Sequence, residues 1–386
     1  MKRIRVLCFS LAYTPFVSGA EIAVQEIVRR LISKGDYEFT IITSRVDTKA
    51  AKREEKKHET VIRVGKGNLS RDKYLYPFQA SSAAKQVEAD LVFVSMESFA
   101  AYAGILYNRK HSSTPAVLNS QNGDTEEYIK RKLWPFTFLY RWAYSKHYHY
   151  TVISRFLAKR AVSQGISPSR ITLVPNGVNS SQFKRTPKLE LQAKKLRSKL
   201  GLGKKKVILT TSRLSFKNGI DDCIRSMKAL PEDTVLLVVG SGEDEKKLKA
   251  LPASTGVGPR VLFLGRLDYD ELPAYYVLAD VFVRPSISEG FGNSFIEALS
   301  CQTPIVGTRV GGIPDFLTEG KTGLFCAVRN PGDLAKKIGL LLADPKLSKR
   351  IGAAGRRMVL EKYDWNNVAD QYDNLFKRIL QSNRQG

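Results

Sequence analysis

The sequence predicts an α/β protein built from two doubly wound, mostly parallel sheets, and three observations support this. The chain has 386 residues, which is enough for two or three domains. Short apolar runs alternate with helical patterns in two separate series. A polar, lysine-rich stretch from Asn179 to Lys205 separates the series. With 43% hydrophobic residues the chain can form sizeable cores, which excludes a disordered protein.

The first series occupies the N-terminal half of the chain. Its expected strands are Ile4–Ser10, Phe39–Thr43, Leu91–Ser95, Ala116–Asn119 and Thr151–Ser154. The start of the chain resembles a secretory signal, but Glu21–Val28 continues as a helical pattern, so we expect a first β-α unit instead. The basic, sparsely apolar segment Thr48–Glu59 is expected to be an exposed loop.

The second series follows the lysine-rich stretch. Its expected strands are Lys206–Ser212, Val235–Gly240, Arg260–Gly265, Val281–Pro285 and Pro304–Gly307. Each precedes a turn and a helix-compatible segment, as a parallel sheet requires. We therefore expect an N-terminal domain over residues 1–185, a C-terminal domain over 186–362, and a helical segment over 363–386 that can return to the N-terminal domain.

Charge and cysteine content narrow the class of protein. The formal net charge of +25 must attract an anionic partner such as nucleic acid, anionic lipid or a phosphate-bearing substrate. The cysteines Cys8, Cys223, Cys301 and Cys326 lack metal-type spacing and are too few for a disulfide framework, so we expect reduced thiols in a cytoplasmic protein. The most apolar stretch, Leu91–Tyr107, is interrupted by Glu97 and does not predict a membrane span.

One motif after a predicted strand has the features of a ligand-binding loop. The strand Val281–Pro285 leads into Ser286-Ile287-Ser288-Glu289-Gly290-Phe291-Gly292-Asn293-Ser294-Phe295-Ile296-Glu297-Ala298. The glycines permit a tight turn, and the helix start near Asn293 leaves N–H groups that can bind phosphate or sugar hydroxyls. Glu289 and Glu297 can accept paired hydroxyl hydrogen bonds from one elongated ligand. The alternative, two surface glutamates at a helix entry, leaves the glycines unexplained.

A second cluster follows the strand Lys206–Ser212. It reads Arg213-Leu214-Ser215-Phe216-Lys217-Asn218-Gly219 and continues as a helix. Two cations at the carboxyl end of a strand suit a diphosphate, because Arg binds it in fork geometry and Lys adds a point charge. In a chain this basic, the position at a strand end carries more information than the cations themselves.

Other patterns are interpreted as structural. Asp268 and Asp270 are spaced like a metal motif, yet they stand at an expected helix start, where acidic residues are common, so we expect no metal. Gly240-Ser241-Gly242 precedes acidic residues that would repel phosphate, which disfavours a dinucleotide fingerprint. The histidines show no ligand spacing.

Several short motifs follow one another along the chain. They are Val174-Pro175-Asn176-Gly177-Val178, Ser212-Arg213-Leu214 with Lys217 and Gly219, Phe263-Leu264-Gly265-Arg266 with Glu271-Leu272, Ala279-Asp280-Val281-Phe282-Val283-Arg284-Pro285-Ser286, the Glu-x7-Glu pattern from Glu289 to Glu297, and Gly311-Gly312-Ile313-Pro314. Near the N-terminus, Ser18-Gly19-Ala20-Glu21 matches a Gly-Gly-Ala-Glu loop except at Ser18. Together these motifs resemble the retaining glycosyltransferases of family 4, also called glycosyl transferases group 1.

The resemblance implies the GT-B fold, in which two Rossmann-like domains face a central cleft, with the acceptor on the N-terminal domain and the nucleotide sugar on the C-terminal one. It implies that Arg213 and Lys217 stabilise the departing diphosphate. Glu289 would contact the donor sugar, Glu297 would hold the ribose, and Gly19 would let the N-terminal domain approach the phosphates. The backbone N–H groups that would face sugar and phosphate belong to Gly290, Phe291, Gly292, Asn293 and Ser294.

Two positions depart from the family's pattern. The family more often has its lysine directly before the glycine, where this chain has Asn218, so Lys217 is displaced by one residue. The family also often has a histidine after the strand Ala116–Asn119, where Gln121 and Asn122 stand here. Either amide can donate a hydrogen bond, but neither can act as an acid or base. With Ser18, these two residues are the candidates for positioning the acceptor or the sugar.

An aromatic and basic segment, residues 130–160, has two equally weighted interpretations. Basic residues beside aromatic ones suit a helix lying among anionic lipid head groups, where each cation contributes about 1 kcal/mol. Core aromatics beneath a solvated basic face explain the same pattern. Stacking on single-stranded nucleic acid ranks lower, because the motifs elsewhere indicate a nucleotide sugar, and we do not expect a nucleic-acid partner.

The motifs and the family resemblance together imply a retaining hexosyltransferase, and we expect it to need no metal or other cofactor. Its expected acceptor is a saccharide, such as a lipid-linked glycan or envelope polysaccharide precursor, and its expected location is cytoplasmic, peripheral on the inner face of a membrane. A GT-B-fold epimerase or phosphorylase is a competing enzyme class. A basic membrane- or nucleic-acid-binding protein without turnover is a third class, and it leaves Glu289 and Glu297 unexplained, because carboxylates oppose polyanions.

Overall fold

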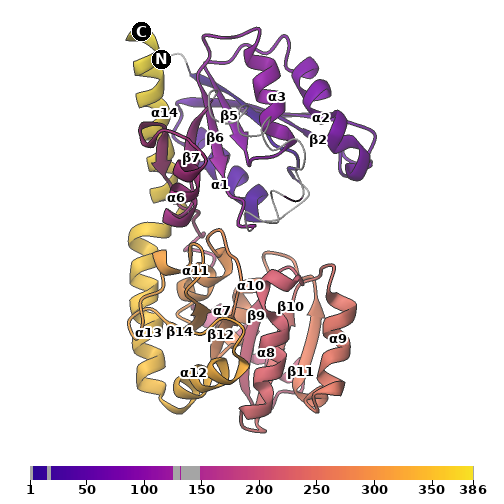
Figure 1. Cartoon of the computed structure of the whole chain (residues 1–386), viewed down its shortest axis with the longest axis vertical. Coiled ribbons are helices and arrows are strands. Elements are labelled where there is room, and N and C mark those ends of the chain that lie inside the picture. Colours follow the sequence, from indigo (N-terminus) through magenta and orange to yellow (C-terminus); the bar gives the residue numbers. More distant parts are fainter. Residues whose placement is uncertain (1–2, 15–18, 125–130, 132–147, 386) are drawn as a thin grey trace. The chain divides into compact units, whose positions relative to one another are not determined.

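The computed structural model describes residues 3–14, 19–124, 131 and 148–385 and divides into two units (Figure 1). Unit 1 comprises Met1–Asn176 together with Trp365–Gly386, and unit 2 comprises Gly177–Asp364. Each unit contains its own sheet and its own apolar core. The two α/β sheets that the sequence predicts are confirmed.

The division between the units falls after Asn176, on the N-terminal side of the boundary expected after residue 185. Residues 177–185 belong to unit 2 because they are bonded to it. Val178 forms a β-bridge with Asp364. The carbonyl of Phe183 accepts hydrogen bonds from the Ser300 hydroxyl at 2.5 Å and from Arg356 Nη1 at 2.8 Å.

The sheet of unit 1 has the strand order β3-β4-β2-β1-β5-β6-β7-β8. Its strands are β1 (Ile4–Phe9), β2 (Tyr37–Ser44), β3 (Arg53–Lys56), β4 (Glu59–Val64), β5 (Leu91–Ser95), β6 (Ala116–Ser120), β7 (His149–Val152) and β8 (Ile171–Leu173). All neighbours are parallel except β3 and β4. The order of the strands reverses between β1 and β5, which is where doubly wound sheets bind ligands.

The expectation that Thr48–Glu59 forms an exposed loop is wrong in part, because β3 lies within this segment. β3 pairs antiparallel with β4 in the register Arg53↔Ile62 to Lys56↔Glu59. Its side chains are charged and mostly exposed, so its composition resembles that of a loop. Edge strands are often short and charged. Backbone pairing holds this one in the sheet, together with an ion pair at 3.0 Å between Glu54 of β3 and the buried Arg63 of β4.

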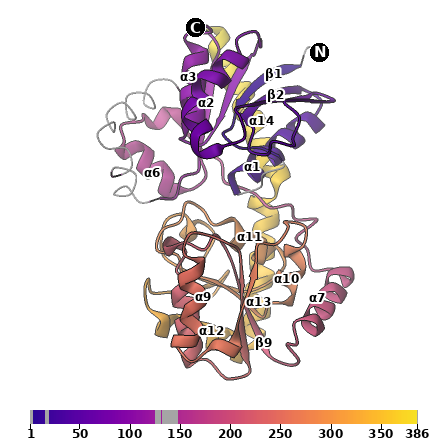
Figure 2. The same ribbon diagram turned by 90° about the vertical axis from the view of Figure 1, so that its right-hand side faces the viewer.

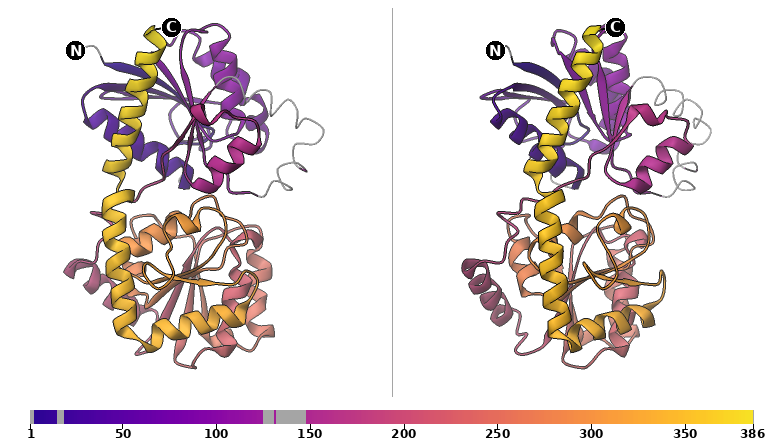
Figure 3. Two further views of the ribbon diagram at one scale, coloured as in Figure 1. Left: turned by 60° about the vertical axis from the view of Figure 1, so that its left-hand side comes forward. Right: turned by 90° about the vertical axis from the view of Figure 1, so that its left-hand side faces the viewer.

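The helices of unit 1 cover both faces of its sheet. Within the described residues they are α1 (Gly19–Ser33), α2 (Leu69–Ala83), α3 (Phe99–Asn108), α6 (Arg155–Ser163) and α14 (Trp365–Gln385). Figure 2 shows α2 and α3 side by side. The C-terminal helix α14 packs along the sheet (Figure 3). Its Tyr372 and Phe376 rings each lie 5.7 Å from the ring of Phe93, and the Tyr37 hydroxyl donates to Asp373 at 2.7 Å.

The sheet of unit 2 is entirely parallel, with the strand order β11-β10-β9-β12-β13-β14. Its strands are β9 (Lys206–Thr211), β10 (Thr234–Val239), β11 (Val261–Gly265), β12 (Val281–Arg284), β13 (Ile305–Thr308) and β14 (Leu324–Cys326). Strands buried on both faces are continuously apolar, and β10 is buried along its whole length. The order reverses between β9 and β12.

The helices of unit 2 pack around this sheet. They are α7 (Pro187–Lys199), α8 (Ile220–Ser226), α9 (Glu245–Ser254), α10 (Leu272–Leu278), α11 (Asn293–Ser300), α12 (Pro331–Ala343) and α13 (Pro345–Met358). All the strands that the sequence predicts are present in the two units, while β3, β4, β8 and β14 are additional. Among the described residues of the whole chain, no helix combines the length and apolar content needed to cross a bilayer.

Candidate functional site

The two motifs expected to carry chemistry meet at the strand-order reversal of unit 2. Residues 212–219 follow β9 and residues 285–292 follow β12, and these strands are neighbours. The Ile287 N–H donates to the Lys217 carbonyl at 2.7 Å. Gly219, at a φ of +67°, lies so close to Pro285 that a Cβ would stand 2.2 Å from the Pro285 carbonyl oxygen. Backbone contacts thus hold the two loops together.

A buried arginine fixes the position of Glu289. Arg284 is the last residue of β12, and its Nη2 pairs with a carboxylate oxygen of Glu289. Its Nη1 donates to the Ser294 hydroxyl at 2.7 Å, and the guanidinium carbon lies 4.9 Å from the centroid of the Phe295 ring. The planar guanidinium therefore determines how the Glu289 side chain is directed. Sequence analysis assigned Arg284 no role, although a charge ending a buried apolar strand was a usable signal.

The rest of Glu289 is also held. Its other carboxylate oxygen accepts hydrogen bonds from the N–H groups of Gly290 at 3.0 Å and Phe291 at 3.4 Å. Those N–H groups were expected to face sugar and phosphate, but here they point at Glu289. Gly312 donates to the Glu289 carbonyl at 3.2 Å, and a Cβ on Gly311 would lie 1.7 Å from that oxygen. The Glu289 side chain keeps 17% exposure, so a ligand can reach it.

Helix α11 begins at the far end of the same loop. Gly292 precedes it with a φ of +108°, and α11 starts at Asn293, which is partly exposed. The Phe295 N–H donates to the Gly292 carbonyl at 2.9 Å, and the positive end of the helix dipole at this terminus favours an anion. Ser294 is buried against Arg284. The Phe291 ring packs 5.5 Å from the rings of Phe316 and Tyr363, so its side chain belongs to the core.

Glu297, expected to hold a ribose, is buried in the core of unit 2. The Tyr276 hydroxyl donates to its carboxylate at 2.7 Å and lies 2.7 Å from the Thr211 hydroxyl at the end of β9. Tyr269 also forms a hydrogen bond with this carboxylate. Burial raises the pKa of Glu297 to about 7, while the two tyrosines and the positive charge of Arg284 oppose that rise. The tyrosines thus occupy the carboxylate that the ribose was expected to use.

The spacing of Asp268 and Asp270 has a structural explanation. Asp270 accepts a hydrogen bond from the Gln182 amide at 2.8 Å. The Asp268 N–H donates to the Glu271 carboxylate at 3.0 Å, a bond typical of a helix start. Within the described ranges, no group of three or more His, Cys, Asp or Glu side chains is arranged to hold a metal ion.

Arg213 and Lys217 lie on the loop after β9. The Arg213 side chain is 72% exposed, and its Nε donates to Glu243 at 2.9 Å. Asn218 stands where the family more often has lysine; it is buried, and its amide donates to the Arg213 carbonyl at 2.6 Å and to the Ser215 hydroxyl at 3.2 Å. Asn218 therefore shapes the loop that presents Arg213, and Lys217 is the partly exposed cation beside it.

Gly240 and Gly242, which precede Glu243, allow two loop backbones to approach each other closely. A Cβ on Gly240 would lie 1.9 Å from the Ser212 carbonyl oxygen, and one on Gly242 would lie 2.3 Å from that of Leu214. The Leu214 N–H donates to the Ser241 carbonyl at 2.9 Å. Close packing of the loops after β9 and β10 thus requires these glycines, and it places the Glu243 carboxylate beside Arg213.

The candidates of unit 1 are partly described. Gly19 is the first residue of α1, and Ser18 lies outside the described residues. Gln121 accepts a hydrogen bond from the Asn176 amide at 3.0 Å, and its own Nε2 is buried without a partner in the described part of the chain. The Asn122 side chain accepts from the Asp124 N–H at 2.9 Å. Gln121 therefore keeps a buried donor that no described residue satisfies.

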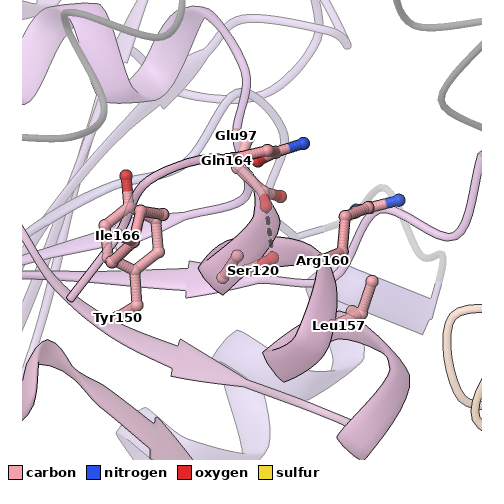
Figure 4. Close-up of a pocket in the computed structure, with 8 residues that line it drawn as sticks. Glu97, Ser120, Tyr150, Leu157, Arg160, Gln164 and Ile166 are labelled. Atoms are coloured by element: carbon pink, nitrogen blue, oxygen red, sulfur yellow. Dashed lines mark hydrogen bonds between the residues drawn. The ribbon is translucent and has the colours of Figure 1, made fainter. Parts of the chain in front are cut away.

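A pocket in unit 1 contains a residue that sequence analysis did not assign (Figure 4). Glu97 follows β5 at the strand-order reversal and accepts a hydrogen bond from the Ser120 hydroxyl. Its Oε2 is buried, and no described residue bonds to it. Arg160 lines the same pocket and donates to the carbonyls of Asp124 and Asn122. In the sequence Glu97 is visible only as a charge that interrupts an apolar run. Its position at the strand-order reversal could not be predicted, because it depends on the order of the strands in the sheet.

Most of the aromatic and basic segment 130–160 lies outside the described residues, namely 130 and 132–147. In the described remainder, Tyr148 and Tyr150 are buried in unit 1, while Phe156 is exposed. The Tyr148 hydroxyl donates to the Ala101 carbonyl at 2.5 Å. These two tyrosines therefore belong to the core.

Comparison with known proteins assigns both halves of the chain to related families. Residues 17–182 match the family described as "Glycosyltransferase Family 4", and residues 192–358 match "Glycosyl transferases group 1". The "GDP-mannose-dependent alpha-(1-6)-phosphatidylinositol monomannoside mannosyltransferase" of Mycolicibacterium smegmatis is 32% identical over 56% of this chain and 58% of its own length. The "Sulfoquinovosyl transferase" of Arabidopsis thaliana is 30% identical over 70% of this chain and 53% of its own length.

A solved structure gives the fold of the whole chain. Sucrose-phosphate synthase from Thermosynechococcus elongatus superposes with a TM-score of 0.83, covering 98% of this chain and all of that one at 20% identity. Among curated sequences, by contrast, this chain spans little more than half the length of the relatives it matches. Identity at this level establishes the architecture and leaves substrates to be argued from the residues.

Proposed function

Because this chain belongs to the family-4 glycosyltransferases, glycosyl transferases group 1, and has their GT-B fold, we propose that it is a retaining, metal-independent hexosyltransferase. Its donor is a nucleoside diphosphate sugar bound by unit 2, and its acceptor is a saccharide hydroxyl bound by unit 1. The observation that supports this most directly is the Glu289 carboxylate, held by Arg284 at a strand-order reversal whose loops also carry Arg213 and Lys217.

The proposed site residues fall into two groups according to the charge that each group stabilises. Departure of a nucleoside diphosphate leaves negative charge on phosphate oxygens and positive charge on the anomeric carbon. Arg213, Lys217 and the first N–H groups of α11 are suited to the phosphate, and Glu289 to hydroxyls of the sugar. Gly19 keeps its proposed place beside the phosphates. For Glu297 the proposed ribose contact uses the acceptor sites that Tyr276 and Tyr269 leave on the carboxylate, and it requires the buried side chain to become accessible.

The proposed transfer is a front-face substitution. The acceptor oxygen bonds to the anomeric carbon as the bond from that carbon to the phosphate oxygen breaks. The acceptor proton moves to the departing diphosphate oxygen, so no protein base is needed. This accords with Gln121 and Asn122, neither of which can take a proton, standing after β6.

The acceptor we propose is lipid-linked, or is a precursor of an envelope polysaccharide, on the cytoplasmic face of a membrane. The basic excess of the chain, stronger in its first half, favours an anionic or membrane-associated acceptor. The name of the mycobacterial relative specifies a phosphatidylinositol-based acceptor for that protein. The cysteines are free and buried, which accords with a reducing compartment.

A donor screen followed by product analysis tests the proposal. Nucleoside diphosphate hexoses are screened by thermal shift, where a ligand at about 100 times its dissociation constant adds about 2.7 kcal/mol of stability. Stabilising donors are then incubated with lipid and saccharide acceptors, and the anomeric configuration of the product is read by NMR. We expect a transferred sugar with retained configuration. An epimerised donor without transfer, or no turnover with any donor, would refute the proposal.

A further inference from the structure

Helix α2 exposes large apolar side chains on one face. Tyr74 is 61% exposed, Leu75 54% and Phe78 66%. Residues at these spacings share one side of a helix. The opposite side is buried through Tyr76 and Ala80. An apolar face open to water is unfavourable, and clustered apolar surface of this kind marks interaction sites.

The exposed face is held firmly in place. The Tyr76 hydroxyl donates to the Ile42 carbonyl at 2.6 Å and lies 3.2 Å from that of Ser10. Asp72, buried in the first turn, accepts hydrogen bonds from the N–H groups of Lys66, Gly67 and Asn68 at 2.8, 2.9 and 3.0 Å. The orientation of α2 on the sheet thus follows from bonds to its buried side.

Positive charge flanks the apolar residues. Arg71 is exposed in the first turn of α2, Lys85 is exposed in the turn two residues after the helix ends, and the Lys73 ammonium lies 5.0 Å from the centroid of the Tyr74 ring. The acidic residue of α2, Asp72, is turned into the protein. The exposed face therefore combines apolar and cationic groups without a carboxylate of its own helix.

We propose that this face, the α2 stripe (Arg71, Tyr74, Leu75, Phe78, Ser82 and Lys85), docks unit 1 on an anionic membrane surface. Leu75 and Phe78 would enter the boundary between head groups and acyl chains, and Tyr74 would lie at the level of the head groups. Arg71 and Lys85 would meet anionic lipid. The stripe precedes the segment 130–160 in the sequence, and the proposal does not depend on transferase activity.

A membrane suits the stripe better than a protein partner. Stable protein interfaces bury on the order of 800 Å² on each side, with a continuous apolar centre. The apolar part of the α2 stripe consists of three side chains, with the partly exposed Phe99 of α3 at 5.2 Å from the Tyr74 ring, and cations flank it. A bilayer accepts a few inserted side chains and attracts each flanking cation separately.

Vesicle co-sedimentation of the full chain tests the proposal. Phosphatidylcholine vesicles with and without phosphatidylglycerol are compared, and we expect binding to the anionic vesicles that weakens with salt. The triple variant Tyr74→Ser/Leu75→Ser/Phe78→Ser should lose binding about tenfold or more. The charge variant Arg71→Glu/Lys85→Glu should lose the preference for anionic vesicles. Each variant changes exposed side chains, and thermal unfolding verifies that it folds.

The matched control removes exposed leucines of unit 2. Leu191→Ser/Leu340→Ser alters α7 and α12, where the leucines are 55% and 47% exposed and lysines are close in sequence, and should bind as the wild type does. Absence of wild-type binding, or equal binding by the triple variant, would overturn the proposal. So would a triple variant that changes only the oligomeric state in light scattering, since the stripe would then contact a second copy. Donor binding measured on the same variants separates this result from the proposed function.

Discussion

Units 1 and 2 share a doubly wound topology, but they differ in the polar groups at the reversal of strand order. In unit 2, Arg284 connects β12 to Glu289 and Ser294, and Tyr276 connects α10 to Glu297. In unit 1, buried polar atoms at or after the ends of β2, β5 and β6 have no partner among the described residues; they belong to Thr43, Ser44, Glu97, Asn119 and Gln121. Unit 2 also has such atoms at or after the ends of β9 and β12, and they belong to Thr210, Arg284 and Ser286.

The difference indicates two ways of preparing a binding surface. A buried polar group without a hydrogen-bond partner destabilises the folded protein by about 1–3 kcal/mol. The polar groups at a sheet edge with several of them are therefore satisfied only when a polar ligand or water binds there. The cross-bonded groups of unit 2 are already oriented before a ligand arrives. We therefore expect substitutions in unit 2 to impair the chemical step and substitutions in unit 1 to impair acceptor binding.

Removing charge from the centre of the unit 2 site should have the largest effect. Glu289→Ala and Arg213→Ala should each reduce turnover about a hundredfold or more, the scale of lost transition-state stabilisation. The measurement is kcat at saturating donor, with circular dichroism to confirm folding. Glu38→Ala, an exposed carboxylate on β2, is the control. Near-normal transfer by both folded variants would remove the basis of the proposed site.

Arg284→Met tests whether the buried guanidinium positions Glu289. We expect kcat to fall about tenfold while the KM of the donor changes less, and stability to fall by about 3–5 kcal/mol because Glu289 loses its partner. Arg260→Met is a matched control, since Arg260 is equally buried and caps the carbonyls of Met227, Leu230 and Pro231. If both variants lose stability and keep kcat, Arg284 is only structural.

Gly311→Ala tests the backbone support of Glu289. The added Cβ would meet the Glu289 carbonyl oxygen, so the loop must shift, and we expect several-fold lower kcat. Gly320→Ala shares the left-handed backbone, at φ +67° against +54°, but has no atom within 4 Å of the added Cβ. It should cost about 1–2 kcal/mol of stability and leave kcat unchanged. Equal kcat in the two variants would contradict the support we describe.

Glu97→Gln tests the edge of unit 1. The substitution replaces one carboxylate oxygen with an NH2 group, which takes the buried Oε2 position in one of the two orientations of the amide. We expect the KM of the acceptor to rise about three- to tenfold while the KM of the donor stays constant. Glu88→Gln, an exposed residue paired with Arg5, should change neither. A rise in donor KM instead would mean that unit 1 does not separate acceptor from donor as proposed.

The last prediction concerns stability and not turnover, and it is a pH dependence from Glu297. Its pKa is raised from 4.5 to about 7, so between these values the folded state holds a proton that the unfolded state has released. This contribution to stability is full below about pH 4.5 and is lost as the pH rises through 7. Urea unfolding across this window should therefore show wild type declining relative to Glu297→Gln. Parallel profiles would show that Glu297 is charged throughout.

Sequence analysis located the strands and the loops that follow them with good accuracy, because buried parallel strands are continuous apolar runs and glycines mark the turns. It could not identify β3, whose charged residues resemble those of a loop, or the short strands β8 and β14. Arg213, Lys217 and Glu289 were predicted as site residues from position and chemistry. Arg284 and Glu97 were not, since their partners are set by strand order and helix packing.

The amino-acid sequence by itself determined the two α/β sheets, the family and the loops that carry charge, because these depend on local periodicity and on motifs of adjacent residues. Only the tertiary structure decided which groups meet. In the folded protein Glu297 accepts a hydrogen bond from Tyr276, Glu289 pairs with Arg284, and the side chains of Tyr74, Leu75 and Phe78 are exposed to solvent. Hydrogen bonds and burial join residues from separate elements, and their free energies depend on distances that no local pattern specifies.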